Sequence, residues 1–267
     1  MSILRTGYPD LYLSRLALMV KVIKDSMDGH PSIYPQLFNV ETMTGPFVQT
    51  TGVSGFAQIP ELSEGEDVTY QDILQGYDKK YTALKYRGGY KISREALDDD
   101  LDSSFRDAAR QLGFSAADTI ETIAMNTFNN GFNSSYTGPD GKELFATDHP
   151  LLGGGTEQNE LTNSADLSVT SLQQALVDFM DTTTNQGLKQ YIKPKILLVP
   201  YELNFQGAQL LQSVQDPESA NNAINPLKNQ GLTLVSSEFL TDTDAWYLLA
   251  APANHFLKFY WRVHIIK

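Results

Sequence analysis

Apolar residues repeat at helical spacing in two long stretches of this chain, and the pattern between them is that of extended chain. The first stretch predicts an amphipathic helix from Pro9 to about Met27, with apolar side chains every three or four positions. Gly29 and the two prolines that follow are expected to end it, and residues 30–38 to be extended. Such a helix cannot bury its apolar stripe alone, so we expect an arm that packs on the body or on a neighbour.

Residues 39–92 predict a long two-stranded excursion. Glycine and proline interrupt the first half, and the second half, from Tyr77 to Ile92, is rich in strand formers. Residues 60–67 lie between the two arms and carry too much charge and too few apolar side chains to form a core. They are therefore predicted to be an exposed tip.

The second helical stretch is predicted to begin at Ser93, a suitable N-cap, because Asp98 to Asp100 favour a helix N-terminus through the macrodipole. Apolar residues then recur every three or four positions until residues 129–131, Asn-Asn-Gly, stop the pattern. At about 1.5 Å per residue the helix would be on the order of 50 Å long.

The rest of the chain alternates between helical and strand patterns, with a domain boundary expected near residue 150. We predict mixed α and β layers around one sheet, an α+β fold. Asp242 to Asp244 is expected to form a turn into a strand, and Phe256 to Trp261 to be a core strand. The predicted elements are helix 168–182, strand 196–199, helix 202–213 and strands 232–235, 246–250 and 256–261.

Charge is segregated along the excursion. From Asp25 to Asp78 there are nine acidic residues and no lysine or arginine, whereas the stretch from Lys79 to Arg94 has six cations and no acid. This favours contacts between copies, in which the acidic tip of one lies over the basic strand of the next. The alternative is a solvated acidic hairpin. The predicted interface residues are Glu61, Glu64, Glu66 and Asp67 at the tip and Lys79, Lys80, Lys85, Arg87, Lys91 and Arg94 on the strand.

Composition excludes several classes of protein. A chain of 267 residues with 41% hydrophobic content can bury a substantial core. Its net charge of −12 argues against a dedicated nucleic-acid reader. The absence of cysteine excludes disulfides, thiolate nucleophiles and cysteine-ligated zinc, and is compatible with a reducing cytoplasm. Neither a signal peptide nor a membrane span is expected from the sequence.

No constellation of residues predicts catalysis, a cofactor or a metal site. Asp148 and His149 are adjacent, but neighbours on an extended chain point apart, and Pro150 favours a structural turn. The acids from Asp98 to Asp102 fan out around a helix, and the glycines at 153–155 lack the lysine of a phosphate loop, so a hinge or loop is expected there.

Several short strings, in order and spacing, resemble the tailed-phage major capsid proteins, and specifically the major head subunits of Mu-like phages and prophages. The resemblance covers most of the chain. It rests on residues 90–98 (Tyr-Lys-Ile-Ser-Arg-Glu-Ala-Leu-Asp), 138–141 (Gly-Pro-Asp-Gly), 144–151 (Leu-Phe-Ala-Thr-Asp-His-Pro-Leu), 165–168 (Ala-Asp-Leu-Ser), 197–200 (Leu-Leu-Val-Pro), 225–227 (Asn-Pro-Leu), 240–242 (Leu-Thr-Asp), 245–247 (Ala-Trp-Tyr) and 257–262 (Leu-Lys-Phe-Tyr-Trp-Arg).

The resemblance implies the Hong Kong 97 capsid fold and a non-enzymatic subunit. Hexamers and pentamers of it would form an icosahedral or prolate shell that encloses double-stranded DNA without binding it tightly. The expected partners are further copies, a scaffold, a portal and decoration proteins; assembly would occur in the cytoplasm of a host bacterium and the product would be the virion capsid. The implied domains are an N-terminal arm (1–38), an extended loop with its returning strand (39–92), a peripheral domain with the spine helix (93–150 plus 256–267) and an axial domain (151–255).

Two details depart from the family. Some relatives join subunits through a lysine in the extended loop, but no lysine lies between Lys24 and Lys79, so a shell without that covalent link is expected. The family pattern also continues beyond Arg262, so either the sequence is truncated or the peripheral domain is completed differently. Two other functions stay open: the shell of a cargo-enclosing nanocompartment of the same fold and, least favoured, a hydrolase that uses His149 with Asp148.

Overall fold

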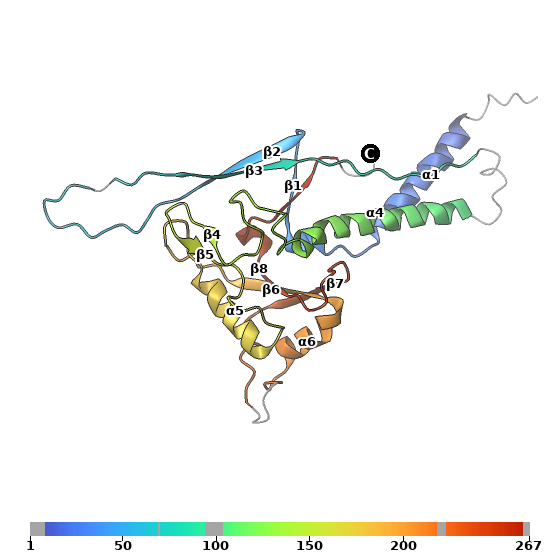
Figure 1. Ribbon diagram of the computed structural model, residues 1–267. Helices are drawn as coiled ribbons and strands as arrows, with labels where there is room; N and C mark the ends of the chain where they lie inside the picture. Colours follow the sequence, from blue (N-terminus) through green and yellow to red (C-terminus); the bar gives the residue numbers. More distant parts are fainter. Residues whose placement is uncertain (1–8, 69, 94–103, 218–222, 264–267) are drawn as a thin grey trace, which may run out of the picture.

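The computed structural model describes residues 9–68, 70–93, 104–217 and 223–263. Its body narrows toward one end, a long loop projects from one side of the wide end, and a pair of helices extends from the other side (Figure 1). Helices and strands are both present, in agreement with the predicted α+β class.

The N-terminal helix packs against the longest described helix. Helix α1 (Pro9–Asp28) confirms the predicted arm helix and lies along α4 (Ser104–Asn129). The Ser26 hydroxyl donates to the Arg110 carbonyl at 2.9 Å. A Cβ on Gly113 would lie 2.4 Å from the Ile23 carbonyl oxygen, so only glycine permits this approach. The end of α4 is as predicted, and its predicted start at Ser93, with the acids at 98–102, lies outside the described residues.

The prediction that residues 30–38 are extended is wrong, because a short helix, α2 (Tyr34–Leu37), interrupts them. Proline occupies its first turn, where it disturbs no helical hydrogen bond. The buried carboxylate of Glu121 on α4 accepts hydrogen bonds from the backbone amides of Ile33 (2.9 Å) and Tyr34 (3.2 Å). These bonds tie the end of the arm to α4.

The body is built on a three-stranded sheet with β6 (Pro194–Pro200) in the centre. It pairs in parallel with β7 (Thr233–Ser237) and antiparallel with β8 (Tyr247–Ala250). Ile196 and Leu198 of β6 face one core cluster, and Leu197 and Val199 face another. An unbroken apolar run therefore forms a strand that is covered on both faces.

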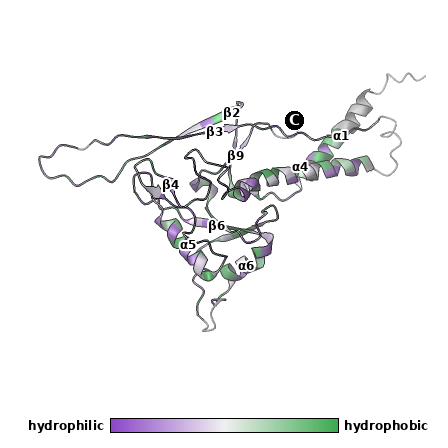
Figure 2. Cartoon of the chain, in the orientation of Figure 1, coloured by the Kyte–Doolittle hydropathy of each residue, from purple (hydrophilic) through white to green (hydrophobic). Residues whose placement is uncertain are grey.

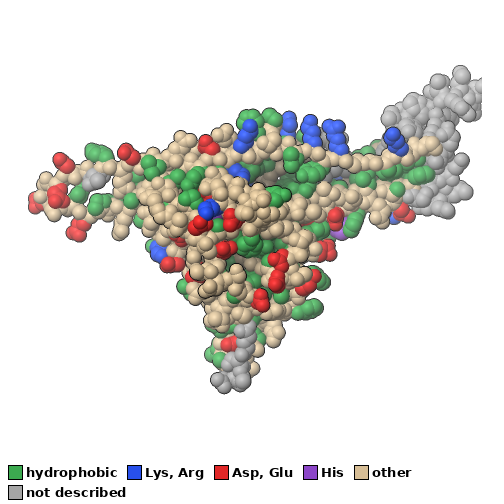
Figure 3. All heavy atoms as spheres, in the orientation of Figure 1, with side chains coloured by type: hydrophobic (Ala, Val, Ile, Leu, Met, Phe, Trp, Pro, Cys, Tyr) green, Lys and Arg blue, Asp and Glu red, His purple; other side chains and the backbone are tan. Residues whose placement is uncertain are grey.

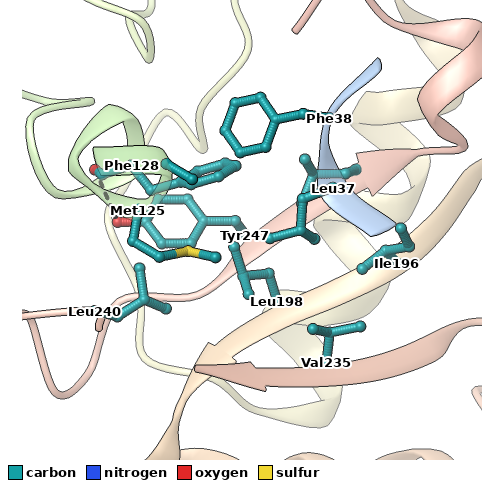
Figure 4. Close-up of a cluster of buried hydrophobic side chains, with 11 residues drawn as sticks. Leu37, Phe38, Met125, Phe128, Ile196, Leu198, Val235, Leu240 and Tyr247 are labelled. Carbon is teal, nitrogen blue, oxygen red and sulfur yellow. Dashed lines mark hydrogen bonds between the residues drawn. The ribbon is translucent and has the colours of Figure 1, made fainter. Parts of the chain in front are cut away.

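One face of this sheet packs against the C-terminal end of α4. Fully buried Phe128 lies between Phe38 and Tyr247, with ring centroids 5.7 and 5.3 Å away (Figure 4). The Tyr247 hydroxyl donates to the Phe128 carbonyl at 3.3 Å, and burial raises the pKa of Tyr247 to about 12. Arm, long helix and sheet thus share one core.

Two helices cover the other face. Helix α5 (Val169–Asp181) begins with a capping box between Ser168 and Ser171, and α6 (Asn204–Gln212) follows a short 3₁₀ turn, η2 (Tyr201–Leu203). Apolar and polar residues alternate around both helices (Figure 2). These elements, with β6, β7 and β8, confirm the predicted order of helices and strands.

The expectation of one sheet is wrong. Strand β9 (Lys258–Trp261) leaves β8 through a 3₁₀ turn, η3 (Pro252–Asn254), and pairs in parallel with β1 (Asn39–Thr42) as a separate two-stranded sheet. The 3₁₀ turn that begins at Pro252 separates β9 from β8, and β1 is the strand partner of β9. Phe256, predicted to be core, is 91% exposed at the outer edge of this turn.

Candidate subunit interface

The predicted two-stranded excursion is present as a hairpin that leaves the body. Strand β2 (Phe47–Val53) pairs antiparallel with β3 (Gln75–Thr82), with Val48 opposite Tyr81 and an irregularity between Thr51 and Val53. At this point a Cβ on Gly76 would lie 2.8 Å from the backbone of Gly52, so the strands approach as only glycine allows.

Two contacts fix the base of the hairpin on the body, and one further hydrogen bond joins the two ends of the hairpin. The Tyr77 hydroxyl donates to the carbonyl of Pro150 at 3.2 Å. Pro150 belongs to β4 (His149–Pro150), which pairs with β5 (Thr156–Glu157). The rings of Tyr81 and Tyr260 lie 5.0 Å apart, and the Ala83 amide donates to the Pro46 carbonyl. The hairpin therefore has a fixed origin and a defined direction.

Beyond Ser54 the loop makes few contacts. Ser54 and Leu74 exchange two hydrogen bonds across the loop, and the Gln71 side chain accepts from the Ala57 amide at 2.8 Å. Among the described residues from 55 to 73, the only backbone–backbone hydrogen bond joins Glu66 to Ser63. Large apolar side chains are exposed here, notably Ile59 at 85% and Tyr70 at 91%. Charge segregation along the sequence does not mark these apolar positions, although the residues themselves are visible there.

The structure gathers the predicted acidic residues at the end of this loop. Glu61, Glu64, Glu66 and Asp67 are all exposed, and none forms an ion pair with any described residue. Among the described residues, the only hydrogen bond to one of these four carboxylates is from the Ser63 amide to Glu66, at 3.0 Å. Acidic side chains cluster at the far end of the projecting loop in Figure 3.

The predicted cations lie on the returning segment and are likewise without ionic partners in the described part of the chain. Arg94 lies outside the described residues. Lys80 is held over the Phe47 ring at 4.3 Å from its centroid, and a row of blue side chains follows the upper edge of the molecule (Figure 3). We call residues 79–93, with Lys79, Lys80, Lys85, Arg87 and Lys91, the basic strip.

Residues 84–92 of the basic strip are extended and belong to no strand pair of the described chain. Residues 84–92 make no backbone–backbone hydrogen bond with the described part of the chain. The Tyr90 hydroxyl donates to the Phe105 carbonyl at 3.3 Å, and Leu112 of α4 lies beside Gly88. Gly88 and Tyr90 thus lie toward the helices, whereas Leu84 and Tyr86 are more than half exposed. The cations Lys85, Arg87 and Lys91 occupy the alternate, odd-numbered positions.

The acidic tip and the basic strip of one chain run in opposite directions from the base of the hairpin (Figure 1). They form no ion pair with each other within the described chain.

His149 takes part in a structural network of hydrogen bonds. Its Nδ1 lies 2.6 Å from a carboxylate oxygen of Asp140, and its Nε2 lies 3.2 Å from the amide oxygen of Asn159. Asp148 instead pairs with Lys142, and this interaction raises the pKa of the Lys142 ammonium. As the sequence predicts, Asp148 does not orient His149. No nucleophilic side chain is among the described hydrogen-bond partners of His149.

The glycines at 153–155 form a tight turn. Gly154 and Gly155 have φ values of 93° and 89°, and a Cβ on Gly153 would lie 2.6 Å from the Asn185 carbonyl. The described residues contain no group of three or more acidic or histidine side chains able to hold a metal ion. No described helix is long and apolar enough to cross a bilayer.

Comparison with known proteins agrees with this geometry. The sequence model of the phage capsid protein family matches residues 76–263. The chain belongs to the phage capsid protein family. The resemblance that the sequence carries to tailed-phage major capsid proteins is thereby confirmed.

One curated relative is similar to part of this chain. It is 24% identical over 160 residues to the Mu-like prophage FluMu major head subunit of Haemophilus influenzae, a match that covers 59% of this chain. The matched region spans half the length of that relative.

The fold is similar to that of the bacteriophage JBD30 capsid decorated with minor capsid protein trimers, with a TM-score of 0.63 and 15% identity over 79% of this chain and 92% of that chain. The JBD30 procapsid gives the same TM-score and identity over 86% and 99% of the two chains.

Proposed function

We propose that this chain is a major head subunit of a tailed bacteriophage or prophage, that it adopts the Hong Kong 97 fold, and that it assembles into hexamers and pentamers of a shell around double-stranded DNA. The observation that carries the proposal is the projecting loop, whose acids, apolar side chains and backbone have almost no partners in their own chain. A monomer gains nothing from such a loop, whereas a shell subunit needs surfaces that reach its neighbours.

The proposed domains follow the fold. Residues 1–38 are the arm and 39–92 the extended loop with its returning strand. Residues 93–150 with 256–267 form the peripheral domain around α4, and 151–255 form the axial domain around β6. The shared core of Phe128 and Tyr247 at the boundary of the last two supports a rigid connection between them.

Within the shell, the acidic tip of one copy neutralises the basic strip of the next. The tip contributes four acids and the described part of the strip five cations, and none of these nine has an ionic partner among the described residues of its own chain. Opposite, unmixed charges fix the register of neighbouring copies and suppress wrong contacts.

The partners proposed for the whole shell are a scaffold, a portal and decoration proteins. The JBD30 capsid, which has a similar fold, is decorated with minor capsid protein trimers, and this supports decoration proteins as partners of the present chain. The subunit does not bind the enclosed DNA tightly, because its net charge of −12 disfavours close contact with phosphate. Assembly in the host cytoplasm precedes release as a virion.

Negative-stain electron microscopy of the expressed chain, alone and with its scaffold, tests this function. Rings, tubes or shells are the expected result. A stable monomer under all conditions would overturn the proposal, and particles filled with protein in place of DNA would favour a nanocompartment shell. After boiling in denaturant the shell should run as a 29.7 kDa monomer, because the loop has no lysine to form a covalent link.

A further inference from the structure

Two segments are extended and largely exposed, and neither has a strand partner among the described residues. One is the described part of the returning limb of the loop, residues 66–68 and 70–73, and the other is residues 84–92 of the basic strip. Bare backbone amides and carbonyls along an extended segment are a template for another strand. The inference below rests on the proposed function and specifies how two copies meet.

The returning limb is better suited to be a strand than the outgoing one. Residues 66–73 contain no glycine or proline and include Val68, Tyr70 and Ile73, which favour strands. The outgoing limb, residues 55–65, contains Pro60, which cannot donate to a ladder, and a glycine at each end.

The spacing of charges matches between the two segments. Glu66 and Asp72 are six residues apart, and so are Lys85 and Lys91. Because side chains alternate along a strand, each pair projects from a single face. Two strands can therefore place both acids opposite both cations at once.

We propose that residues 66–73 of one copy add as an antiparallel strand to residues 84–91 of a second copy, with Glu66 opposite Lys91 and Asp72 opposite Lys85. The same register sets Tyr70 against Arg87, a cation–π pair, on the charged face. On the other face it sets Ile73 against Leu84, both of which are more than half exposed in the single chain.

A parallel alignment also matches the charges but is poorer. It would place Val68 near Arg87 and Tyr70 near Gly89, so the cation–π pair and the contact between Ile73 and Leu84 would both be lost. Antiparallel pairing is also slightly more stable per residue. The occupant of the strip is a second copy because the limb of the same chain runs the other way (Figure 1).

The chain contains no cysteine, so two single-cysteine variants can report the contact between copies. Gln71→Cys and Tyr86→Cys are opposite each other in the proposed register and leave every charge in place. Opposed residues in an antiparallel pair have Cα atoms about 4.5–5.5 Å apart, within the range of a disulfide. Co-assembled and mildly oxidised, the two variants should give a disulfide-linked heterodimer on a non-reducing gel.

The matched control uses positions that would be opposed only in the parallel alignment. Ile73→Cys co-assembled with Ile92→Cys should stay monomeric, whereas Ile73→Cys co-assembled with Leu84→Cys should cross-link. If the Gln71→Cys and Tyr86→Cys variants do not form particles, the cross-link between Ile73→Cys and Leu84→Cys tests the antiparallel register instead. Particles in which neither antiparallel combination cross-links, or only the parallel one does, would overturn the inference.

Failure of the inference is distinguishable from failure of the proposed function. If the unmodified chain forms shells and the antiparallel combinations do not cross-link in them, the strand addition is wrong and the capsid function stands. If the unmodified chain never assembles, the proposed function itself fails.

Discussion

The central sheet and the extended loop are both rich in strand-forming residues, but they satisfy their backbones in different ways. Strand β6 has a strand on each side and an apolar cluster on each face. The loop beyond Ser54 has one backbone–backbone bond among its described residues, and residues 84–92 of the basic strip have none with the described part of the chain. The sheet completes its hydrogen bonding within one chain, whereas we propose that the loop and the strip complete theirs between chains.

This contrast separates stability from assembly. Substitutions in the sheet should unfold the chain, and substitutions in the loop should leave the chain folded but unable to join its neighbours. The predictions below test that separation, beginning with the largest effect.

Reversal of the acidic tip should abolish assembly. Glu64→Lys, Glu66→Lys and Asp67→Lys together would set like charges against the basic strip, and particles should be absent by electron microscopy at low salt. The matched control adds Lys85→Glu, Arg87→Glu and Lys91→Glu, which restores opposite charges and should restore particles. Normal particles from the first variant alone would contradict the proposed pairing.

A core truncation and a loop truncation should have opposite consequences. Phe128→Ala removes a fully buried ring and should lower the free energy of unfolding by about 3–5 kcal/mol in a denaturant titration. Ile59→Ala removes a side chain that is 85% exposed and should change it by less than about 0.5 kcal/mol. Loss of stability in the loop variant would show that the loop folds back on its own chain.

Glu121 should make the joint between arm and body sensitive to pH. Burial raises the pKa of its carboxyl, although the amides of Ile33 and Tyr34 oppose the shift. The folded chain therefore binds this proton more tightly than the unfolded chain. Protonation of Glu121 stabilises the folded chain, and this contribution is fully present below the ordinary glutamate pKa. It is lost as the pH rises through the raised pKa of Glu121 in the folded chain.

Denaturant titrations at a series of pH values should detect this pH-dependent change in the free energy of unfolding. Glu121→Gln keeps an acceptor oxygen without the charge, so the stability of the unmodified chain relative to this variant should fall as the pH rises from below the ordinary glutamate pKa through the raised one. Glu121→Ala leaves both amides without their acceptor and should cost about 1–3 kcal/mol. A constant difference between the unmodified chain and the glutamine variant across this range would refute the assignment.

The ion pair between β1 and β9 should have the smallest effect. Lys258 lies 2.7 Å from Glu41, and its hydrogen bond lowers the pKa of the Glu41 carboxyl. The stabilisation is present above the ordinary glutamate pKa and disappears as pH falls through the lowered one. Because both groups are partly exposed, Lys258→Met should cost only about a few tenths of a kcal/mol at pH 7. Lys195→Met, an exposed site without an ion pair, serves as the control and should have no such pH dependence.

Part of the candidate interface could be predicted from the sequence, because charge segregation is a local property of composition. The acids between Glu61 and Asp67 and the cations from Lys79 onward are visible without coordinates, and so is the absence of a catalytic pair at His149. What could not be predicted is that Asp140 and Asn159 hold His149. Those contacts join residues nine and ten positions away through a loop whose path depends on packing.

The sequence alone determined the helices, the order of strands and the exposed tip, because apolar periodicity and turn residues act over a few positions. Only the tertiary structure decided that β9 pairs with β1 and leaves the sheet of β6, and that Glu121 fixes a short helix where extended chain was expected. These outcomes depend on contacts between residues more than 80 positions apart, whose free energies no local pattern encodes. The unpaired state of residues 84–92 also emerged only from the folded chain, since a strand-like sequence does not reveal whether its partner lies in the same molecule.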